Sequence, residues 1–361
     1  MKVLQFLTGI GVGGIERFVA DIVSHSSEEY EYDFFVFGRE ETEFLKYIKT
    51  KGEVYVCRGW SFAALKALWR VLGRKKYDVV HAHAGCYSFI VLAVAAMRGV
   101  GRRIAHSHSA DSFAHLDKKS KPVWLLSRIF GPLFITDYLA CSNHAAENTF
   151  GPGVLHSGKY KRILNPVDVS LYNPDDDSSD AAALRRELGL RENSRVVCNV
   201  GYLGRHKNQN FILRLALEHP DDNIDWLLVG DGSCRGEFEK FAEDNSLSGV
   251  HFAGIRNDVP KILGMCDVFI LPSVLEGLGT VVLEAQAAGT PCIVSENVTC
   301  ETDLGLGLVT RLPLSEPDKW YDAIISVPRT EIDRAAIEKA FSDSGVEINK
   351  CTETVEKIYK G

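Results

Sequence analysis

Short apolar runs alternate with longer amphipathic stretches along the whole chain of 361 residues. Helical patterns at 14–27, 40–51, 61–75 and 87–98 separate most of the runs in the first half. Those runs are typical of buried strands: KVLQFLT, YDFFVFG, EVYVCRG, DVVHAHA, RRIAHSHS and DYLACSN. Strands that alternate with helices predict βαβ units, and therefore a parallel sheet with helices on both faces.

A second series of the same kind follows in the other half of the chain: RVVCNVG, DWLLVGDG, VHFAG, DVFILPS and PCIVSE. Between the two series lies the polar segment 169–194, which contains Pro, Asn and an acidic run. We interpret its first half as a linker between two α/β domains, and a chain of this length suits two domains. A long surface loop within one domain is the alternative.

Composition narrows the class of protein. The net charge is −7, and a chain without a strongly basic balance is not expected to bind nucleic acid. Nine cysteines include no C-x-x-C pair and lie mostly inside apolar runs, which predicts buried, reduced thiols. The chain opens with a strand-like run rather than a signal sequence, and no apolar run reaches the ~18 residues of a spanning helix. We expect a soluble, cytoplasmic protein.

The stretch LTGIGVGGIERF places glycines at 9, 11 and 14, the G-x-G-x-x-G spacing of a dinucleotide-binding turn. Glycines allow a ligand to approach the main chain, and the start of a helix near Ile15 favours an anion. An NAD site also needs an acidic residue after the second strand. The sequence there is Gly38-Arg39-Glu40, which leaves open whether that requirement is met. The loop therefore predicts a phosphate or sugar site, or only a tight turn.

The segment 267–295, DVFILPSVLEGLGTVVLEAQAAGTPCIVS, carries more information. An apolar strand is followed by a glycine-rich turn and by a helix from about Thr280, so the N–H groups of 277–280 suit a diphosphate. Glu276 and Glu284 would repel phosphate, and we expect them to face hydroxyl groups of a sugar or ribose. Glu284 lies among apolar residues, which favours a partnered carboxylate over a solvated one.

The chain resembles the retaining nucleotide-sugar glycosyltransferases of the large family 4 group. The E-x7-E spacing of Glu276 and Glu284, with E-G-x-G and A-x-A-x-G, is the most specific signature of that group. Further motifs extend the resemblance over nearly the whole chain: GVGGIERF, YDVVHAHAG, ILNPVD, LLVGDGSCR and VHFAGIRNDVP. RRIAHSHSA is most similar to exopolysaccharide and capsule transferases.

The resemblance implies an α/β protein of GT-B fold, with two Rossmann-like parallel-sheet domains that face each other across a cleft. Residues 1–168 would bind the acceptor, and residues 169–343 the nucleotide sugar. The C-terminal helix, 344–361, would pack back onto the first domain. The implied reaction moves a sugar, with retention, from a UDP- or GDP-sugar to a glycan or lipid-linked acceptor in cell-surface polysaccharide synthesis. It implies no metal and no cofactor.

The same resemblance implies roles for individual residues. Lys207 would neutralise the leaving diphosphate, Glu276 would hold the donor sugar, and His108 would lie near that sugar. Tyr202 stands where the family has an arginine; either Arg205 substitutes from the same loop, or the alignment slips. Donor binding is implied for nine residues: Gly13, Gly14, Gly230, Arg256, Gly277, Leu278, Gly279, Thr280 and Glu284, the last through the ribose hydroxyls.

Four histidines form two H-x-H pairs near strand ends, His81 with His83 and His106 with His108. Residues i and i+2 of a strand point to the same side, so each pair could bind a metal. Asp111 is the one acidic or thiol ligand that stands out nearby. We therefore favour hydrogen-bonded histidines, above all for His81 and His106, over a metal site.

Residues 58–78 combine six basic residues with two tryptophans. They predict either an ordinary covering helix or a peripheral patch on anionic lipid at the inner face of the cell membrane, close to a lipid-linked acceptor.

Two other functions stay open. An NAD-dependent oxidoreductase is favoured only by the opening glycines. That function would assign no role to Lys207 or to the turn that begins at Glu276. A GT-B protein could also be a nucleotide-sugar epimerase or a non-catalytic binder of sugar nucleotides.

Overall fold

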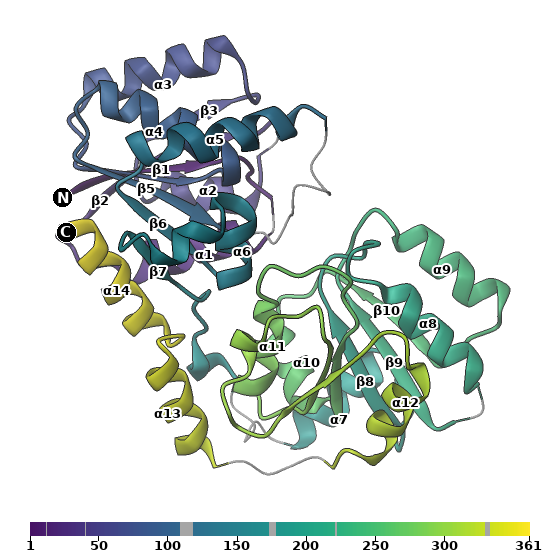
Figure 1. Cartoon of the computed structure of the whole chain (residues 1–361). Coiled ribbons are helices and arrows are strands. Elements are labelled where there is room, and N and C mark those ends of the chain that lie inside the picture. Colours follow the sequence, from purple (N-terminus) through teal and green to yellow (C-terminus); the bar gives the residue numbers. More distant parts are fainter. Residues whose placement is uncertain (12, 40, 109–117, 173–177, 221, 329–332) are drawn as a thin grey trace. The chain divides into compact units, whose positions relative to one another are not determined.

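Two parallel β-sheets, each covered by helices, form the core of the structure (Figure 1). The computed structural model of the chain describes residues 1–11, 13–39, 41–108, 118–172, 178–220, 222–328 and 333–361. The chain divides into two units. Unit 1 contains Met1–Pro166 and Ile348–Gly361, and unit 2 contains Val167–Glu347.

Unit 1 has a seven-stranded sheet of order β3-β2-β1-β4-β5-β6-β7. The strands are β1 (Lys2–Leu7), β2 (Glu31–Phe37), β3 (Val54–Cys57), β4 (Val79–His83), β5 (Arg102–Ser107), β6 (Asp137–Ala140) and β7 (Tyr160–Arg162). The helices are α1 (Gly14–His25), α2 (Glu43–Lys49), α3 (Phe62–Arg74), α4 (Ser88–Met97), α5 (Ser120–Phe134), α6 (Asn143–Phe150) and α14 (Ile348–Lys360). The six predicted strands of this half are confirmed, and only the short edge strand β7 was not predicted.

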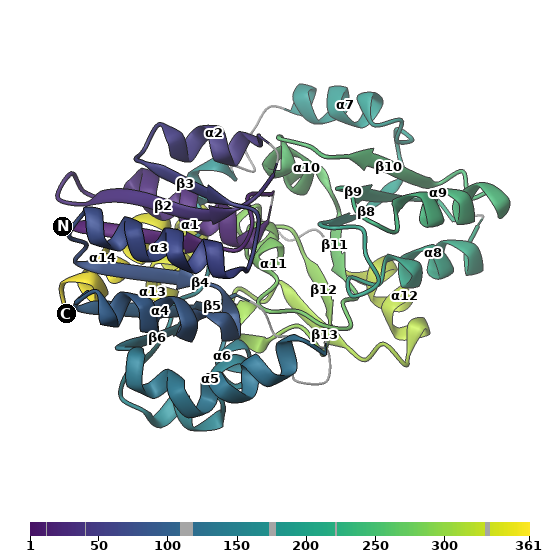
Figure 2. The ribbon, with the colours of Figure 1, turned by 90° about the horizontal axis from the view of Figure 1, so that it is seen from above.

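One face of this sheet is covered by helices from both ends of the chain. Val3 of β1 and Val79 of β4 pack in one apolar cluster with Phe18 of α1, Ile48 of α2 and Val355 of α14. Figure 2 shows α3 and α4 as neighbouring helices of the same unit. Because both faces are covered, the strands are apolar almost throughout, as the sequence pattern indicated.

Unit 2 has a six-stranded parallel sheet of order β10-β9-β8-β11-β12-β13. The strands are β8 (Arg195–Val200), β9 (Ile224–Val229), β10 (Val250–Gly254), β11 (Val268–Leu271), β12 (Cys292–Ser295) and β13 (Val309–Leu312). The helices are α7 (Ser178–Glu187), α8 (Gln209–Glu218), α9 (Arg235–Asp244), α10 (Val259–Met265), α11 (Thr280–Ala287), α12 (Pro317–Ser326) and α13 (Arg334–Ser344). The buried Trp320 of α12 packs with α8 and α9 on one face, whereas Ile262 of α10 packs on the other.

In both sheets the strand order reverses once, between β1 and β4 in unit 1 and between β8 and β11 in unit 2. Loops that leave the carboxyl ends of two such strands diverge to opposite faces of the sheet. The space between them is where open α/β sheets bind ligands. The sequence motifs after these four strands are therefore the first places to look for a site.

The chain passes from unit 1 to unit 2 between Pro166 and Val167 and returns between Glu347 and Ile348. The polar segment 169–194 therefore lies within unit 2, and the last helix of unit 1 begins at Ile348. No helix in the described ranges combines the length and the apolar composition needed to cross a membrane.

Candidate functional site

The glycine-rich turn of unit 2 lies at the carboxyl end of β11 and leads into α11 as predicted. Gly279 caps the helix with a φ of 80°, a left-handed conformation that a side chain disfavours. The main-chain N–H groups of 277–280 stand at the positive end of the helix dipole. Glu284 lies one turn into the helix and is half-buried. The turn thus offers main-chain donors beside a carboxylate.

Lys207 reaches this turn from the loop after β8, across the reversal in strand order. Its ammonium nitrogen lies 2.5 Å from Glu276 Oε2, and the two side chains are only 16% and 12% exposed. The main chain fixes this approach, because Val274 N–H donates to the His206 carbonyl at 2.9 Å. The amide of Asn208 also donates to the Pro272 carbonyl at 3.1 Å. The sequence-predicted lysine and the E-x7-E turn are therefore brought together.

Arg205, the predicted substitute for the family arginine, lies in the same loop but points elsewhere. Its side chain is 85% exposed and pairs with Glu237 of α9 at 3.4 Å. Tyr202 occupies the arginine position itself, and its hydroxyl accepts the Ser233 N–H at 3.0 Å. The contacts of Arg205 thus give no support to its predicted catalytic role.

Gly230 and Arg256, predicted near the donor base, have structural reasons for their residue types. A Cβ at Gly230, where φ is 128°, would lie 2.0 Å from the Gly201 carbonyl oxygen, so only glycine fits. Arg256 pairs with Asp258 and with Glu187 at 2.6 Å, and these carboxylates raise its pKa. Its positive charge is already compensated within unit 2.

In unit 1 the glycine loop lies between β1 and α1. Gly13 caps α1, and Gly14 is its first residue. The Glu16 carboxylate turns back over the loop and accepts the Gly11 N–H at 3.1 Å. A Cβ at Gly13 would lie 2.8 Å from Glu16 Oε2, so this close packing needs glycine in the present conformation.

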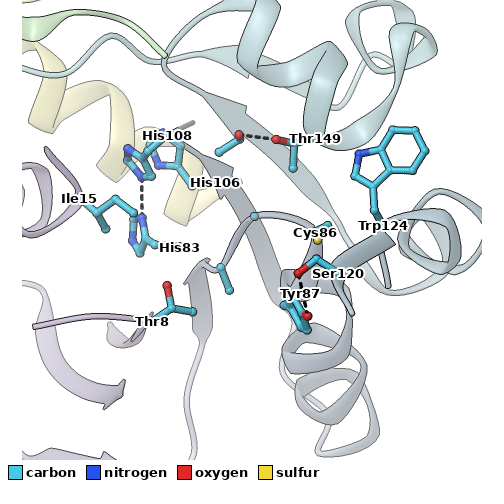
Figure 3. A pocket seen from close by; sticks show the side chains of 13 residues that line it. Thr8, Ile15, His83, Cys86, Tyr87, His106, His108, Ser120, Trp124 and Thr149 are labelled. Atoms are coloured by element: carbon cyan, nitrogen blue, oxygen red, sulfur yellow. Dashed lines mark hydrogen bonds between the residues drawn. The ribbon is translucent and has the colours of Figure 1, made fainter. Parts of the chain in front are cut away.

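A cavity of about 240 Å³ opens at the carboxyl ends of β1, β4 and β5 in unit 1 (Figure 3). Aromatic rings, hydroxyl groups and histidines share its lining, which includes Thr8, His83, Tyr87, His106, Ser107, His108, Ser120, Trp124 and Thr149. Ser107 and Thr149 hydrogen-bond each other at 2.6 Å, as do Tyr87 and Ser120 at 3.2 Å. The described lining residues include no carboxylate and no ammonium group, so this part of the cavity suits an uncharged, hydroxyl-bearing ligand.

His81, His83, His106 and His108, here called the histidine cluster, stand together at this end of the sheet. Burial, and to a lesser degree the neighbouring rings, lower the pKa of His81 to about 3 and the pKa values of His83 and His106 well below the usual 6.5. Burial also lowers the pKa of His108 to about 3, although the nearby Asn165 amide acts in the opposite direction. At neutral pH the rings are uncharged, and they can bind hydroxyl groups rather than neutralise phosphate.

Ligand nitrogens of His81, His83 and His106 lie within 4.8 Å of one another, a spacing that could hold a metal ion. The contacts are those of a hydrogen-bonded cluster instead, because both ring nitrogens of His81 and of His83 already have partners at 2.8–3.2 Å. A metal ion would have to displace them. Asp111, the acidic residue considered from the sequence, lies outside the described residues.

Comparison with known proteins identifies the family. A family model described as "Glycosyl transferases group 1" matches residues 180–304, and one described as "Glycosyltransferase Family 4" matches residues 12–171. The chain is also 31% identical over 334 residues to the putative glycosyltransferase EpsF of Bacillus subtilis, covering 90% of this chain and 86% of that protein. The chain belongs to the group 1 glycosyltransferases.

This glycosyltransferase is similar to further members whose names are more specific. It is 31% identical over 241 residues to the Escherichia coli UDP-Gal:alpha-D-GlcNAc-diphosphoundecaprenol alpha-1,3-galactosyltransferase, covering 64% of this chain and 61% of that protein. Its fold matches that of HepE from Anabaena, crystallised with UDP and glucose, with a TM-score of 0.81, 20% identity and full coverage of both chains. Each of its two units is therefore one Rossmann-like domain of the GT-B fold.

Sequence reasoning missed most of the cavity in unit 1. Three lining residues belong to no motif quoted from the sequence: Tyr87, Trp124 and Thr149. Each lies on a segment that follows β4 or β5, or on a helix that packs against one of these strands. The rule that ligands bind at the carboxyl ends of strands could have pointed to Tyr87, which follows His83 closely. Trp124 and Thr149 could be placed at the cavity only once the packing of α5 and α6 was known.

Proposed function

We propose that this glycosyltransferase moves a sugar from a nucleotide-diphosphate sugar to a glycan or lipid-linked acceptor, with retention and without a metal ion, in cell-surface polysaccharide synthesis. One observation carries the proposal: Lys207 and Glu276 meet at the turn that begins α11. Lys207 and the N–H groups of that turn would stabilise the charge that develops on the leaving diphosphate. Glu276 and Glu284 would bind hydroxyl groups of the donor sugar and ribose.

The relatives support the chemical class of both substrates. The name of the E. coli relative specifies a UDP-sugar donor and a diphosphoundecaprenol-linked acceptor, and the Anabaena structure contains UDP and glucose. The neutral, hydroxyl-lined cavity of unit 1 fits an acceptor sugar, as the resemblance implied for that half of the chain. The roles of Gly13, Gly14 and His108 toward the donor stay predictions. NAD-dependent oxidation is not favoured by any of these comparisons.

A screen of UDP- and GDP-sugars with membrane extracts tests the function, and variants test the site. Lys207→Ala should lower kcat/KM about 100- to 1000-fold, which is typical for the loss of one key electrostatic donor. Lys240→Ala is a matched control, because Lys240 is an exposed lysine of α9 that pairs only with Asp244 in the contacts described. Near-normal kcat/KM of Lys207→Ala would refute the assignment. An unchanged anomeric configuration in the product, read by NMR, tests retention.

We also propose peripheral contact with an anionic membrane, and we assign it to α5 rather than to the region 58–78 that the sequence suggested. In that region the Lys75 ammonium is already bound by Asp33 and Glu53. The region 58–78 exposes Trp60, Phe62 and Trp69. Helix α5 exposes a larger set of apolar side chains: Leu125, Leu126, Ile129, Phe130 and Leu133. Residues 118–134 contain four basic residues and no acidic one, a composition suited to anionic lipid.

Sedimentation with phosphatidylglycerol vesicles tests this contact. Leu133→Asp, at a side chain that is 69% exposed, should reduce the bound fraction without affecting the fold. Ile325→Asp, at an exposed apolar side chain of α12 in unit 2, should not. Equal binding by both variants would contradict the role of α5.

A further inference from the structure

A hydrogen-bonded network joins the histidine cluster to the C-terminal helix. Gln5 of β1 lies at its centre: its amide nitrogen donates to the Tyr359 hydroxyl at 3.0 Å, and its amide oxygen lies 2.9 Å from His83 Nε2. His83 Nδ1 in turn lies 2.8 Å from His108 Nε2. Tyr359 belongs to α14, the last helix of the chain.

A second branch starts at the same hydroxyl group. His81 Nδ1 lies 2.8 Å from the Tyr359 oxygen, and His81 Nε2 lies 3.2 Å from His106 Nδ1. The branch ends at His106 Nε2, a buried atom without a hydrogen-bond partner among the described residues. His106 also lines the cavity of unit 1 (Figure 3). Nε2 itself is covered in the present conformation, so a ligand group in the cavity could pair with it only after the side chains around it move. A buried polar atom without a partner, on a residue that lines a cavity, is a candidate for such a contact.

Packing fixes the orientation of the rings, and the variable that remains is which ring nitrogen carries the proton. Phe18 packs edge-on against His106 at 4.8 Å and against His108 at 5.2 Å between ring centroids. Because burial keeps each ring neutral at pH 7, each carries one N–H and one lone pair. The arrangement of donors and acceptors along the network therefore decides which nitrogen is protonated.

Counting protons along the network leaves few solutions. The Tyr359 oxygen accepts the Gln5 N–H, so its own proton goes to His81 Nδ1, and His81 then donates from Nε2 to His106 Nδ1. His106 is left with its proton on Nε2. On the other branch the Gln5 oxygen accepts from His83 Nε2, so His83 Nδ1 must accept from His108 Nε2. All four rings thus carry their proton on Nε2.

Reversal of the Gln5 amide would reverse every step. The Tyr359 hydroxyl would donate to the amide oxygen, and all four rings would carry their proton on Nδ1. Two states make every hydrogen bond of the network and use the Tyr359 proton, and in both of them the terminal atoms His106 Nε2 and His108 Nδ1 have no partner among the described residues. A mixed state leaves either one of these bonds unmade or the Tyr359 hydroxyl proton without an acceptor. The orientation described above is the one in which the phenolic O–H, a good donor, meets an imidazole lone pair.

We propose that Gln5 and Tyr359 are positioning residues that hold the histidine cluster in one common tautomer, so that His106 Nε2 is a hydrogen-bond donor to a sugar hydroxyl in the cavity. The sugar ligand rests on the proposed function, whereas the common tautomer does not. Neither positioning residue needs to touch the ligand.

Two-bond ¹H–¹⁵N NMR spectra of the full chain, labelled at its eleven histidines, test the tautomers directly. At pH 7.5 the four rings, assigned from single His→Asn variants, should all be protonated on Nε2. Tyr359→Phe should allow both tautomers for His81 and His106. Tyr30→Phe is the matched control: Tyr30 packs beside Tyr359 and donates to the Glu356 carbonyl of α14, but among the described contacts it has no bond to the network. It should leave the spectrum unchanged.

Titration with N-acetylglucosamine and with UDP-glucose tests the ligand. The His106 Nε2–H signal should shift with one of these sugars, and Tyr359→Phe should weaken that binding about three- to tenfold, as for one hydrogen bond. Three results would overturn the proposal. The first is a different tautomer on each of the two branches, and the second is identical spectra for Tyr359→Phe and Tyr30→Phe. The third is the absence of any response of His106 to either sugar. Stoichiometric Zn²⁺ binding with loss of the ring N–H signals would overturn it as well. A uniform tautomer and a sugar response without any sugar transfer would count against the proposed function alone.

Discussion

Acidification should destabilise the fold strongly because the histidine cluster is buried uncharged. The pKa of His81 and that of His108 are about 3 in the folded protein, against 6.5 for an unperturbed ring. Below pH 6.5 the unfolded chain therefore binds protons that the folded chain does not. Stability is present above pH 6.5 and is lost as the pH falls toward 3.

The magnitude follows from the linkage relation, in which each pH unit between the two pKa values changes the free energy of unfolding by about 1.4 kcal/mol per ring. From pH 7 to pH 5, each ring contributes a loss of about 2 kcal/mol. His81 and His108 alone give about 4 kcal/mol, and the loss approaches 8 kcal/mol when His83 and His106 behave alike. Since domains are typically stable by about 5–15 kcal/mol, the protein should be close to unfolding near pH 5.

Urea unfolding of the full chain between pH 7 and pH 5, followed by far-UV circular dichroism, measures this loss. His106→Asn should remove about 2 kcal/mol of the pH-dependent loss, because one titrating ring is gone. His156→Asn, which removes an exposed ring outside the histidine cluster, is the matched control. A total loss below about 1 kcal/mol over this range would refute the burial of neutral rings on which the reasoning depends.

Three further substitutions test the packing. Gly279→Ala should cost about 1–2 kcal/mol, because φ is 80° there, whereas Gly264→Ala, in α10 with nothing within 4 Å of a new Cβ, should be neutral or stabilising in thermal unfolding. Trp320→Ala should cost about 3–5 kcal/mol of unfolding free energy in urea, because the side chain is completely buried. Asp33→Ala should cost about 3 kcal/mol in the same assay, because it leaves the Lys75 ammonium and the Tyr77 hydroxyl without their shared carboxylate.

Much of the fold could be predicted because its strands are buried on both faces. Such strands appear as uninterrupted apolar runs, and nearly all of them were identified. The two that were missed, β7 with the sequence YKR and β13 with VTRL, are edge strands with exposed or half-buried residues. An edge strand needs only one apolar face, or none, so its sequence pattern carries little information.

The candidate site could be predicted from local pattern where residues close in sequence share one turn, as Glu276 and Gly277–Thr280 do. Lys207 lies 69 residues before Glu276, and the family resemblance rather than any local pattern placed it at this turn. Distant contacts outside the family motifs left no signal: Arg256 pairs with Glu187, 69 residues away, and Gln5 bonds to Tyr359, 354 residues away. Nothing in the glycine pattern indicated that Glu16 folds back over the loop. Motifs report local geometry, whereas charge compensation and tautomers depend on packing.

In both units the candidate site residues lie beside the reversal in strand order, and the reason is geometric. At that point the loops after two adjacent strands leave in opposite directions, so groups from both can surround a ligand. In unit 2 these groups are Lys207 and Glu276. In unit 1 they are the glycine loop and the histidine cluster. The rings of that cluster are buried, so they cannot rely on water for their hydrogen bonds. Hydrogen-bond partners must come from the packing elements, and Tyr359 supplies one from α14. The return of the chain to unit 1 therefore completes the polar core of that unit as well as its apolar one.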